Sequence, residues 1–175
     1  MKIRHLLYSA LLFIVLAGAA KAEDLSEKPG YVAFTDLSSD YGEPRVLINL
    51  NKTMLGFVSK LNVADTETTE LISKLEGVRV HIYDIEGNEQ PALDLIASVS
   101  KDIQSKNWMP IVSINEENEK VRIFVKMTED SMDGLMVMLV DSSDEGEAVF
   151  INIIGEIDPD QINSVTESLN INIDL

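Results

Sequence analysis

Six stretches of the chain alternate apolar and polar residues, or are apolar throughout, over the length of a β-strand. The clearest is residues 78–85, which places small apolar residues on one face and Arg79, His81 and Tyr83 on the other. The other predicted strands are residues 45–50, 109–115, 120–128, 135–141 and 148–154. Short polar links join the last four, which favours an antiparallel meander. Residues 135–140 are apolar on both faces, so we expect them in a central strand.

Between these strands the apolar residues recur with the period of a helix. Two short helices in series are predicted, one over residues 53–61 and one from a cap at Asp65 to an end near Gly77. The apolar face expected for the first consists of Met54, Phe57, Val58 and Leu61. A turn at residues 86–88 then leads into the longest helix, over residues 91–106, which should cover one face of the sheet. Its apolar stripe is Ala92, Leu95, Ile96, Val99 and Ile103.

A last helix is predicted from Asp158, where proline occupies the first helical position and Gln161 the capping-box position. The element order is therefore β-α-α-β-α-β-β-β-β-α. This order predicts an α+β fold with a mostly antiparallel sheet of about five to six strands and helices packed mainly on one face. No internal repeat divides the chain, so residues 31–175 should form a single domain. Residues 23–30 are expected to be a mobile arm.

The first 22 residues have the pattern of a secretory signal peptide. Basic residues precede an apolar run at residues 6–16, and Ala20 and Ala22 occupy the two positions that signal peptidase reads. The run is shorter than the roughly 20 residues that a membrane-spanning helix needs, and acidic residues follow at once. We therefore expect cleavage after Ala22 and no membrane anchor afterwards.

The composition restricts the compartment and the partners. The chain contains no cysteine, which excludes a lipidated N-terminus, disulfides and thiolate chemistry. Removal of the leader takes three of the 14 basic residues and none of the 30 acidic ones, so the net charge becomes −19. Such a charge repels nucleic acids and anionic lipids and keeps an exported protein soluble. We expect a periplasmic or secreted protein that is not lipidated and does not bind nucleic acid.

Five separated segments carry a family resemblance. They are Gly30-Tyr31-Val32, Asp36-Leu37-Ser38, Pro44-Arg45-Val46 leading to Asn49-Leu50, Leu75 to Val80, and Gly155 to Pro159. This set resembles the bacterial domain of unknown function 4252 family over roughly residues 28–170. The resemblance implies an exported or lipid-anchored envelope protein without an assigned activity, and it brings no catalytic residues. Ala19 stands where some relatives carry a lipidated cysteine, which favours a soluble form.

No catalytic motif is recognisable in the sequence. His81 is the one histidine outside the leader, and we interpret it as an exposed strand residue because no partner is positioned beside it. There is no Gly-x-Ser-x-Gly motif and no glycine-rich phosphate loop. The acidic residues at 141–147 lack the spacing of an EF-hand. A solvated acidic hairpin is the preferred interpretation and cation binding the alternative; neither a metal site nor a cofactor is expected.

One face of the predicted sheet carries an unusual set of side chains. We call it the basic/aromatic stripe, and its members are Arg79, His81, Tyr83, Arg122, Phe124 and Lys126. With helices on the other face only, the stripe would lie open to an acidic protein, a peptide or an anionic glycan. The alternative is that the basic residues pair with acids on neighbouring strands, and that Tyr83 and Phe124 pack under a terminal segment.

These features favour a non-enzymatic binding or adaptor module of the cell envelope that uses the stripe. The alternative is a carboxylate-based hydrolase or transferase acting in the periplasm, which would show a deep pocket with two carboxyl groups of raised pKa. A third hypothesis is self-association through residues 148–154, placed near an edge of the sheet.

Overall fold

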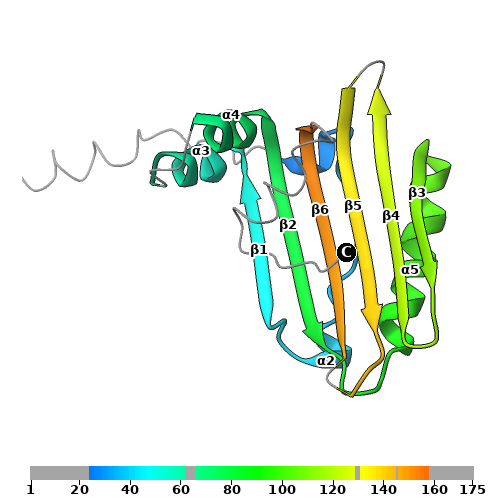
Figure 1. Cartoon of the computed structure of the whole chain (residues 1–175). Coiled ribbons are helices and arrows are strands. Elements are labelled where there is room, and N and C mark those ends of the chain that lie inside the picture. Colours follow the sequence, from blue (N-terminus) through cyan, green and yellow to red (C-terminus); the bar gives the residue numbers. More distant parts are fainter. Residues whose placement is uncertain (1–23, 62–65, 129–130, 145, 158–175) are drawn as a thin grey trace, which may run out of the picture.

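The computed structural model describes residues 24–61, 66–128, 131–144 and 146–157. Four expected features lie outside these ranges: the leader, the cap at Asp65, Glu145 of the acidic hairpin and the helix from Asp158. Six strands form one antiparallel sheet (Figure 1). They are β1 (Val46–Asn51), β2 (Leu75–Asp84), β3 (Trp108–Asn115), β4 (Glu119–Thr128), β5 (Ser131–Asp141) and β6 (Glu147–Ile157).

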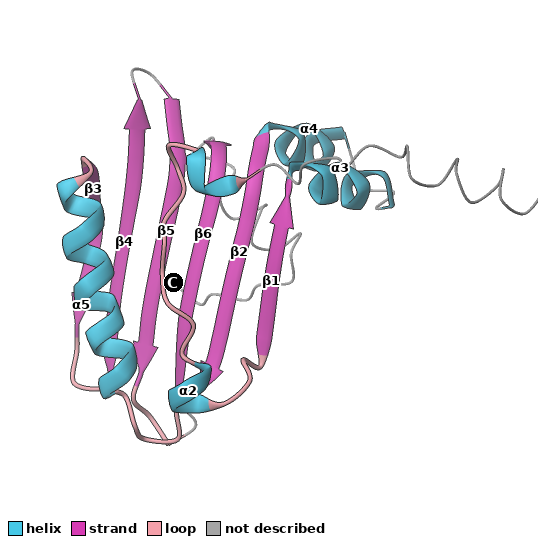
Figure 2. Cartoon of the chain, turned by 180° about the vertical axis from the view of Figure 1, so that it is seen from behind, coloured by secondary structure: helices cyan, strands magenta, loops and turns pink. Residues whose placement is uncertain are grey.

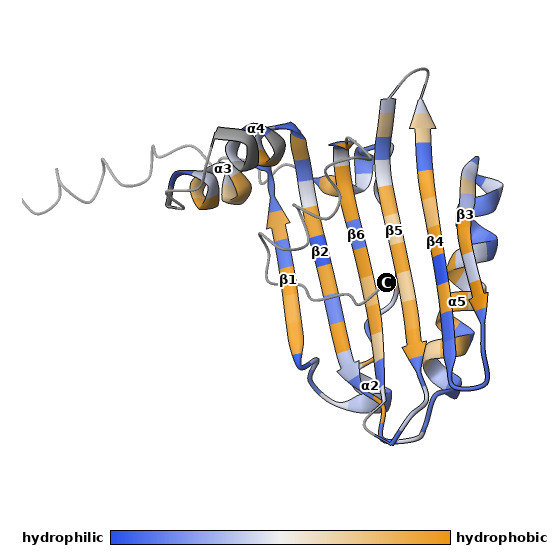
Figure 3. Cartoon of the chain, in the orientation of Figure 1, coloured by the Kyte–Doolittle hydropathy of each residue, from blue (hydrophilic) through white to orange (hydrophobic). Residues whose placement is uncertain are grey.

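The strand order across the sheet is β1-β2-β6-β5-β4-β3. The meander expected for the last four strands is confirmed, and β5 occupies the central position expected for it. The placement of residues 148–154 near an edge is wrong, because β6 pairs with β2 on one side and with β5 on the other. Strands β5 and β6 are hydrophobic along most of their length, as buried central strands require (Figure 3).

Two short helices that were not expected precede β1, and the three after it follow the expected order. They are η1 (Leu25–Glu27), α2 (Ser38–Tyr41), α3 (Lys52–Leu61), α4 (Thr66–Lys74) and α5 (Gln90–Ser105). The α+β class is confirmed, and the apolar stripe predicted for α5 is buried. The turn between β2 and α5 has positive φ angles at its two central residues, Glu86 (43°) and Gly87 (80°), which is the φ pattern of a type I′ turn. No helix in the described part of the chain combines the length and hydrophobicity needed to cross a membrane.

Helix α3 buries a different side from the one expected. Leu55 is buried, whereas Met54 and Phe57 are 50% and 63% exposed. The helix stands beyond the end of β1 and β2 beside α4, so only a narrow side of it meets apolar surface (Figure 1). The side chain of Leu61 lies outside the described part.

Gly77 lies inside β2 instead of ending the preceding helix. Helix α4 ends at Lys74, the strand begins at Leu75, and the pairing with β6 shifts register between Leu75 and Gly77. A Cβ atom on Gly77 would lie 2.7 Å from Cδ1 of Leu25, so the glycine makes room for the leucine of η1. The described part of the arm expected over residues 23–30 thus contacts the sheet, and Lys28 pairs with Glu76 at 3.0 Å.

The two faces of the sheet carry separate hydrophobic clusters. On one face, α5 lies beside an extended segment, residues 30–37, which we call the strap (Figure 2). This face contains Tyr83 and Phe124 of the stripe. The expectation that the helices leave the stripe open is therefore wrong. The reason lies in β5 and β6, whose side chains on this face are apolar and must be covered: Met136, Met138, Val140, Ala148 and Phe150.

Candidate functional site

Asn152 holds the strap through a fully buried side chain. Its Oδ1 atom accepts a hydrogen bond from the backbone N–H of Val32 at 2.9 Å. Its Nδ2 group donates to the carbonyl oxygen of Gly30 at 2.9 Å and to that of Leu135 at 3.2 Å. The amide therefore has partners for both of its ends, as a polar group buried in an apolar strand needs.

Two residues of β2 complete the attachment. Nη1 of Arg79 donates to the carbonyl oxygen of Val32 at 2.7 Å. The hydroxyl of Tyr83 accepts a hydrogen bond from the backbone N–H of Leu37 at 3.1 Å. The sheet thus holds the strap largely through side chains that bind its backbone, rather than by pairing it as a further strand.

Two glycines let the strap approach β5 closely. A Cβ atom on Gly30 would lie 1.9 Å from the carbonyl oxygen of Asp133. One on Gly134 would lie 2.6 Å from Cα of Gly30 and 2.7 Å from the ring of Trp108. Any larger residue at either position would push the two backbones apart.

The basic/aromatic stripe lies on one face of the sheet as expected, but it is divided and covered. Its β2 and β4 members are separated by β6 and β5. Arg122 donates to the carbonyl oxygens of Ile114 and Val121, both at 2.8 Å. Lys126 donates to the carbonyl oxygen of Lys106 at 2.6 Å, at the end of α5, where a cation is favoured. Tyr83 and Phe124 are each 1% exposed and belong to the cluster that includes α5. Of these two, only Tyr83 has a hydrogen bond to the strap among the described residues, so the terminal-segment alternative describes this ring.

The interpretation of His81 as an exposed residue is wrong. Its side chain is 6% exposed, and its ring meets the ring of Phe34 edge-on at a centroid distance of 5.0 Å. Nδ1 lies 3.3 Å from the hydroxyl oxygen of Tyr83, whereas the buried Nε2 has no hydrogen-bond partner in the described part of the chain. Burial lowers the pKa of His81, the charge of Arg79 lowers it further, and Asp36 opposes them.

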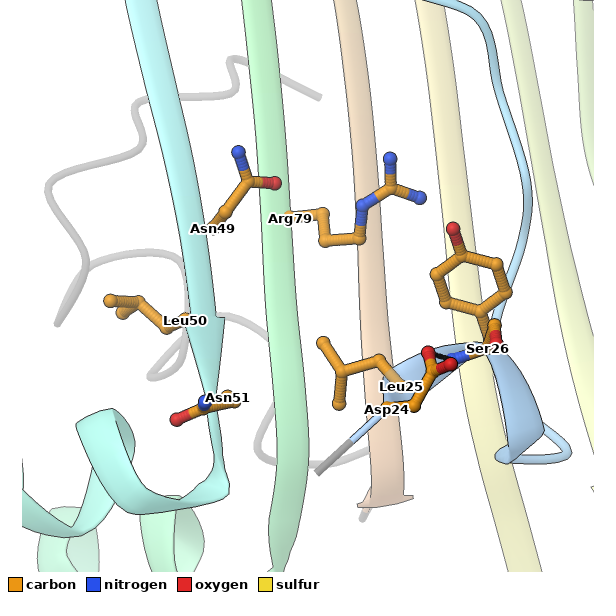
Figure 4. A pocket seen from close by; sticks show the side chains of 8 residues that line it. Asp24, Leu25, Ser26, Asn49, Leu50, Asn51 and Arg79 are labelled. Carbon is orange, nitrogen blue, oxygen red and sulfur yellow. Dashed lines mark hydrogen bonds between the residues drawn. The ribbon is translucent and has the colours of Figure 1, made fainter. Parts of the chain in front are cut away.

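Arg79 is the stripe residue that reaches a pocket. The pocket has a volume of about 470 Å³ and opens between η1 and the end of β1 (Figure 4). The guanidinium carbon lies 5.0 Å from the ring centre of Tyr31 and 4.2 Å from that of Phe34. Burial lowers the pKa of Arg79, and no ion pair joins it to a carboxylate of the described residues. The residues around it are Asp24, Leu25, Ser26, Tyr31, Asn49, Leu50 and Asn51.

A family model described as a domain of unknown function, DUF4252, matches residues 41–165. The chain belongs to this family. No curated protein matches it significantly. Arg79, Tyr83 and Asn152 lie within the DUF4252 match, whereas the strap precedes it. The matched region therefore supplies the side chains that hold a segment lying outside that region.

The hydrolase alternative requires a pocket with two carboxyl groups of raised pKa, and the described carboxyl groups do not supply them. Those whose pKa departs clearly from the ordinary value are Asp24, Asp36 and Glu76, and all three shift downward. Hydrogen bonds cause the shifts: Asp24 and Asp36 accept from the serines two residues later, and Glu76 from Lys52 and Lys28. These groups are held ionised and are poorly suited to act as general acids.

The acidic hairpin lies beside a basic residue. Arg45 pairs with Asp84 at 2.8 Å and also with Glu147, while Asp141 accepts a hydrogen bond from the backbone N–H of Ser143. The described residues contain no group of three or more side chains arranged to hold a metal ion.

Sequence reasoning identified Arg79 but missed the residues that act with it. Asn152 could have been noticed, because it is a polar residue in the middle of an otherwise apolar strand. Asn49 pairs directly opposite Arg79, but that proximity depends on the register between β1 and β2.

Proposed function

We propose that the protein is an exported, non-enzymatic binding module that holds the carboxylate of a ligand at Arg79. One observation carries the proposal: a half-buried guanidinium lines the pocket, and no described carboxylate pairs with it. In a chain with 30 acidic and 14 basic residues, a cation without an acidic partner is unexpected unless another anion takes that place.

The chemistry of the pocket suits a carboxylate. A guanidinium has five N–H donors in a planar fork, and the described protein partner of this one is the carbonyl oxygen of Val32. The remaining donors match the two oxygens of a carboxylate. Asn49 and Asn51 add side-chain amides from β1, and Leu25 and Leu50 add apolar surface. A carboxylate-bearing glycan or peptide fits this combination.

Asp24 restricts the ligand further. Its carboxylate lines the same pocket and accepts a hydrogen bond from the backbone of Ser26. The hydrogen bond keeps its pKa low, so the group stays charged near neutral pH. A ligand with several carboxylates close together would meet repulsion here, whereas hydroxyl or amide donors beside a single carboxylate would be accepted.

Titration calorimetry with residues 23–175 tests the proposal, using an otherwise neutral oligosaccharide that carries one uronic acid and a short peptide with one acidic residue as probes. We expect one of them to bind, and Arg79→Gln to weaken it at least about tenfold, the effect of losing a charge-assisted hydrogen-bonded pair. Arg122→Gln is the matched control, because Arg122 lies on the same face away from the pocket and should leave the affinity unchanged.

Because Arg79 also holds the strap, a second variant separates binding from folding. Asn49→Asp adds a negative charge opposite Arg79 on an exposed position of β1 and leaves every strap contact in place. It should weaken the same ligand several-fold. Unchanged affinity in both the Arg79 and Asn49 variants, or no binding of either probe to the native chain, would contradict the proposal.

A further inference from the structure

The strap occupies a groove that recognises an extended backbone. The floor is formed by Arg79 and Tyr83 of β2 and by Asn152 of β6, and α5 lies on the same face of the sheet (Figure 2). Of the strap side chains, Val32 is 1% exposed and Leu37 6% exposed, both within the cluster that α5 covers. The occupant must therefore be extended, with glycine at the position of Gly30 and aliphatic residues at the positions of Val32 and Leu37.

The strap is joined to the sheet by a short surface link. Helix α2 ends at Tyr41, and β1 begins at Val46. Between them Gly42 has a φ of 79°, its position leaves open space around it, and Glu43 is exposed. Pro44 restricts the backbone of this link. A turn of this kind can open without disturbing the core, because the core residues lie on either side of it.

We propose that the strap is exchanged between two copies of this chain, giving a two-fold dimer in which each groove holds the strap of the other copy. A second copy carries the required glycine, valine and leucine at the required spacing. The strap contacts in the monomer and in the exchanged dimer are the same, so only the link and the concentration decide between them. The Arg79 pocket would then be completed by Tyr31 and Asp24 of the second copy.

The ion pair between Lys28 and Glu76 permits a direct test. Lys28 precedes the strap and Glu76 belongs to β2; their charged atoms are 3.0 Å apart and their side chains are 27% and 22% exposed. Lys28→Glu and Glu76→Lys each place like charges together when the strap stays on its own chain. In a mixture of the two variants, only the exchanged heterodimer restores opposite charges at both positions, because each strap meets the groove of the other variant.

Sedimentation velocity of the two variants, alone and mixed at equal total concentration, measures the exchange. The link is first allowed to open by incubation a few degrees below the melting temperature. We expect an association constant in the mixture about tenfold above that of either variant alone, the effect of restoring two partly buried pairs. A mixture that stays as monomeric as its folded components overturns the proposal.

A second arm uses the native chain in case a variant fails to fold. Residues 23–175, prepared with light and heavy nitrogen isotopes, are mixed before and after the same incubation and examined by native mass spectrometry. Mixed-isotope dimers whose amount rises with concentration support strap exchange, and a monomer at every concentration overturns it. Neither arm involves a ligand, so failure here leaves the carboxylate-binding proposal to its own test.

Discussion

The side-chain oxygen of Asn152 lies 2.9 Å from the backbone nitrogen of Val32, although 120 residues separate the two in the sequence. Asn152 is a polar residue within β6, otherwise largely apolar, and is fully buried. A buried amide in such a place is tolerated only when its hydrogen bonds are made, and here the strap makes two of the three. The central strand and the N-terminal segment therefore depend on each other.

Replacing Asn152 with leucine should destabilise the protein. The substitution leaves the N–H of Val32 and the carbonyl oxygen of Gly30 buried without their partner, which should lower the free energy of unfolding by about 3 kcal/mol. Urea unfolding monitored by circular dichroism measures the loss. Asn49→Leu is the control: Asn49 lies on the same face but is exposed, and its replacement should change stability by less than about 0.5 kcal/mol. Equal effects of the two variants would contradict the role assigned to Asn152.

Adding one methyl group at Gly30 should be costly. The new Cβ atom would lie 1.9 Å from a backbone oxygen of β5, so the strap must shift, and Gly30→Ala should cost at least about 2 kcal/mol. Gly56 provides the opposite case, because it lies within α3 and a Cβ there would meet nothing within 4 Å. Gly56→Ala should stabilise the protein by about 0.5–1 kcal/mol, since alanine is the better helix former. Thermal unfolding of the two variants distinguishes local packing from a general effect of alanine.

Mild acid should loosen the strapped face through His81. Its pKa is lowered in the folded state, so the unfolded chain binds the proton more readily. The stability due to neutral His81 is thus fully present above its unfolded pKa, about 6.5, and is lost as the pH falls below that value. Asp36 and Arg79 act on the group in opposite directions, and burial outweighs the favourable charge.

Melting temperatures of the chain from residue 23 to 175, taken between pH 7.5 and 5.0, measure this effect, because His81 is the one histidine in these residues. His81→Phe keeps an aromatic ring under Phe34 and removes the titration, so its melting temperature should change less over this interval. The carboxyl groups with lowered pKa lose their contribution only at lower pH, which separates them from His81. Identical pH profiles for the native chain and the variant would show that His81 does not cause the effect.

Export provides a prediction that needs no purified ligand. Cleavage after Ala22 should give a mature chain that begins at Glu23, as N-terminal sequencing of the processed protein would show. Replacing Ala22 with a large charged residue removes the small side chain that signal peptidase reads and should leave the precursor unprocessed. Ala19→Arg is the control, because this position is not one of the two that are read. A native chain that keeps its first residues after expression would contradict the export proposal.

Periodicity predicted the elements well, because each strand or helix buries one side and its sequence repeats accordingly. The stripe of α5 and the alternation of residues 78–85 are clear examples. Coverage of the faces was harder to predict, since the covering partner is far away in the sequence: the strap lies over β6, more than 100 residues later. The alternation of apolar and polar residues does not predict strand order either, because it indicates which face a side chain points to but not which strand lies beside it.

At the candidate site, too, a residue could be predicted from its type, but its neighbours in space could not. Arg79 was recognised from its residue type and its place on a strand. The proximity of Arg79 to Tyr31 and Asn49 was not predicted, because it depends on the path of the N-terminal segment and on the register between β1 and β2. The exposure predicted for His81 failed because a polar residue in a strand is usually a surface residue, and here Phe34 covers it.

The attachment of the strap by Asn152 also determines the order in which the chain can assemble. During synthesis the strap is made before every described strand, but its floor is incomplete until β6, the last described strand, has taken its place between β2 and β5. The strap therefore lacks part of its floor while nearly all of the described strands are being produced. The strap is made before the strands that hold it and becomes fixed only after them, so folding must wait for a contact that spans almost all of the described residues.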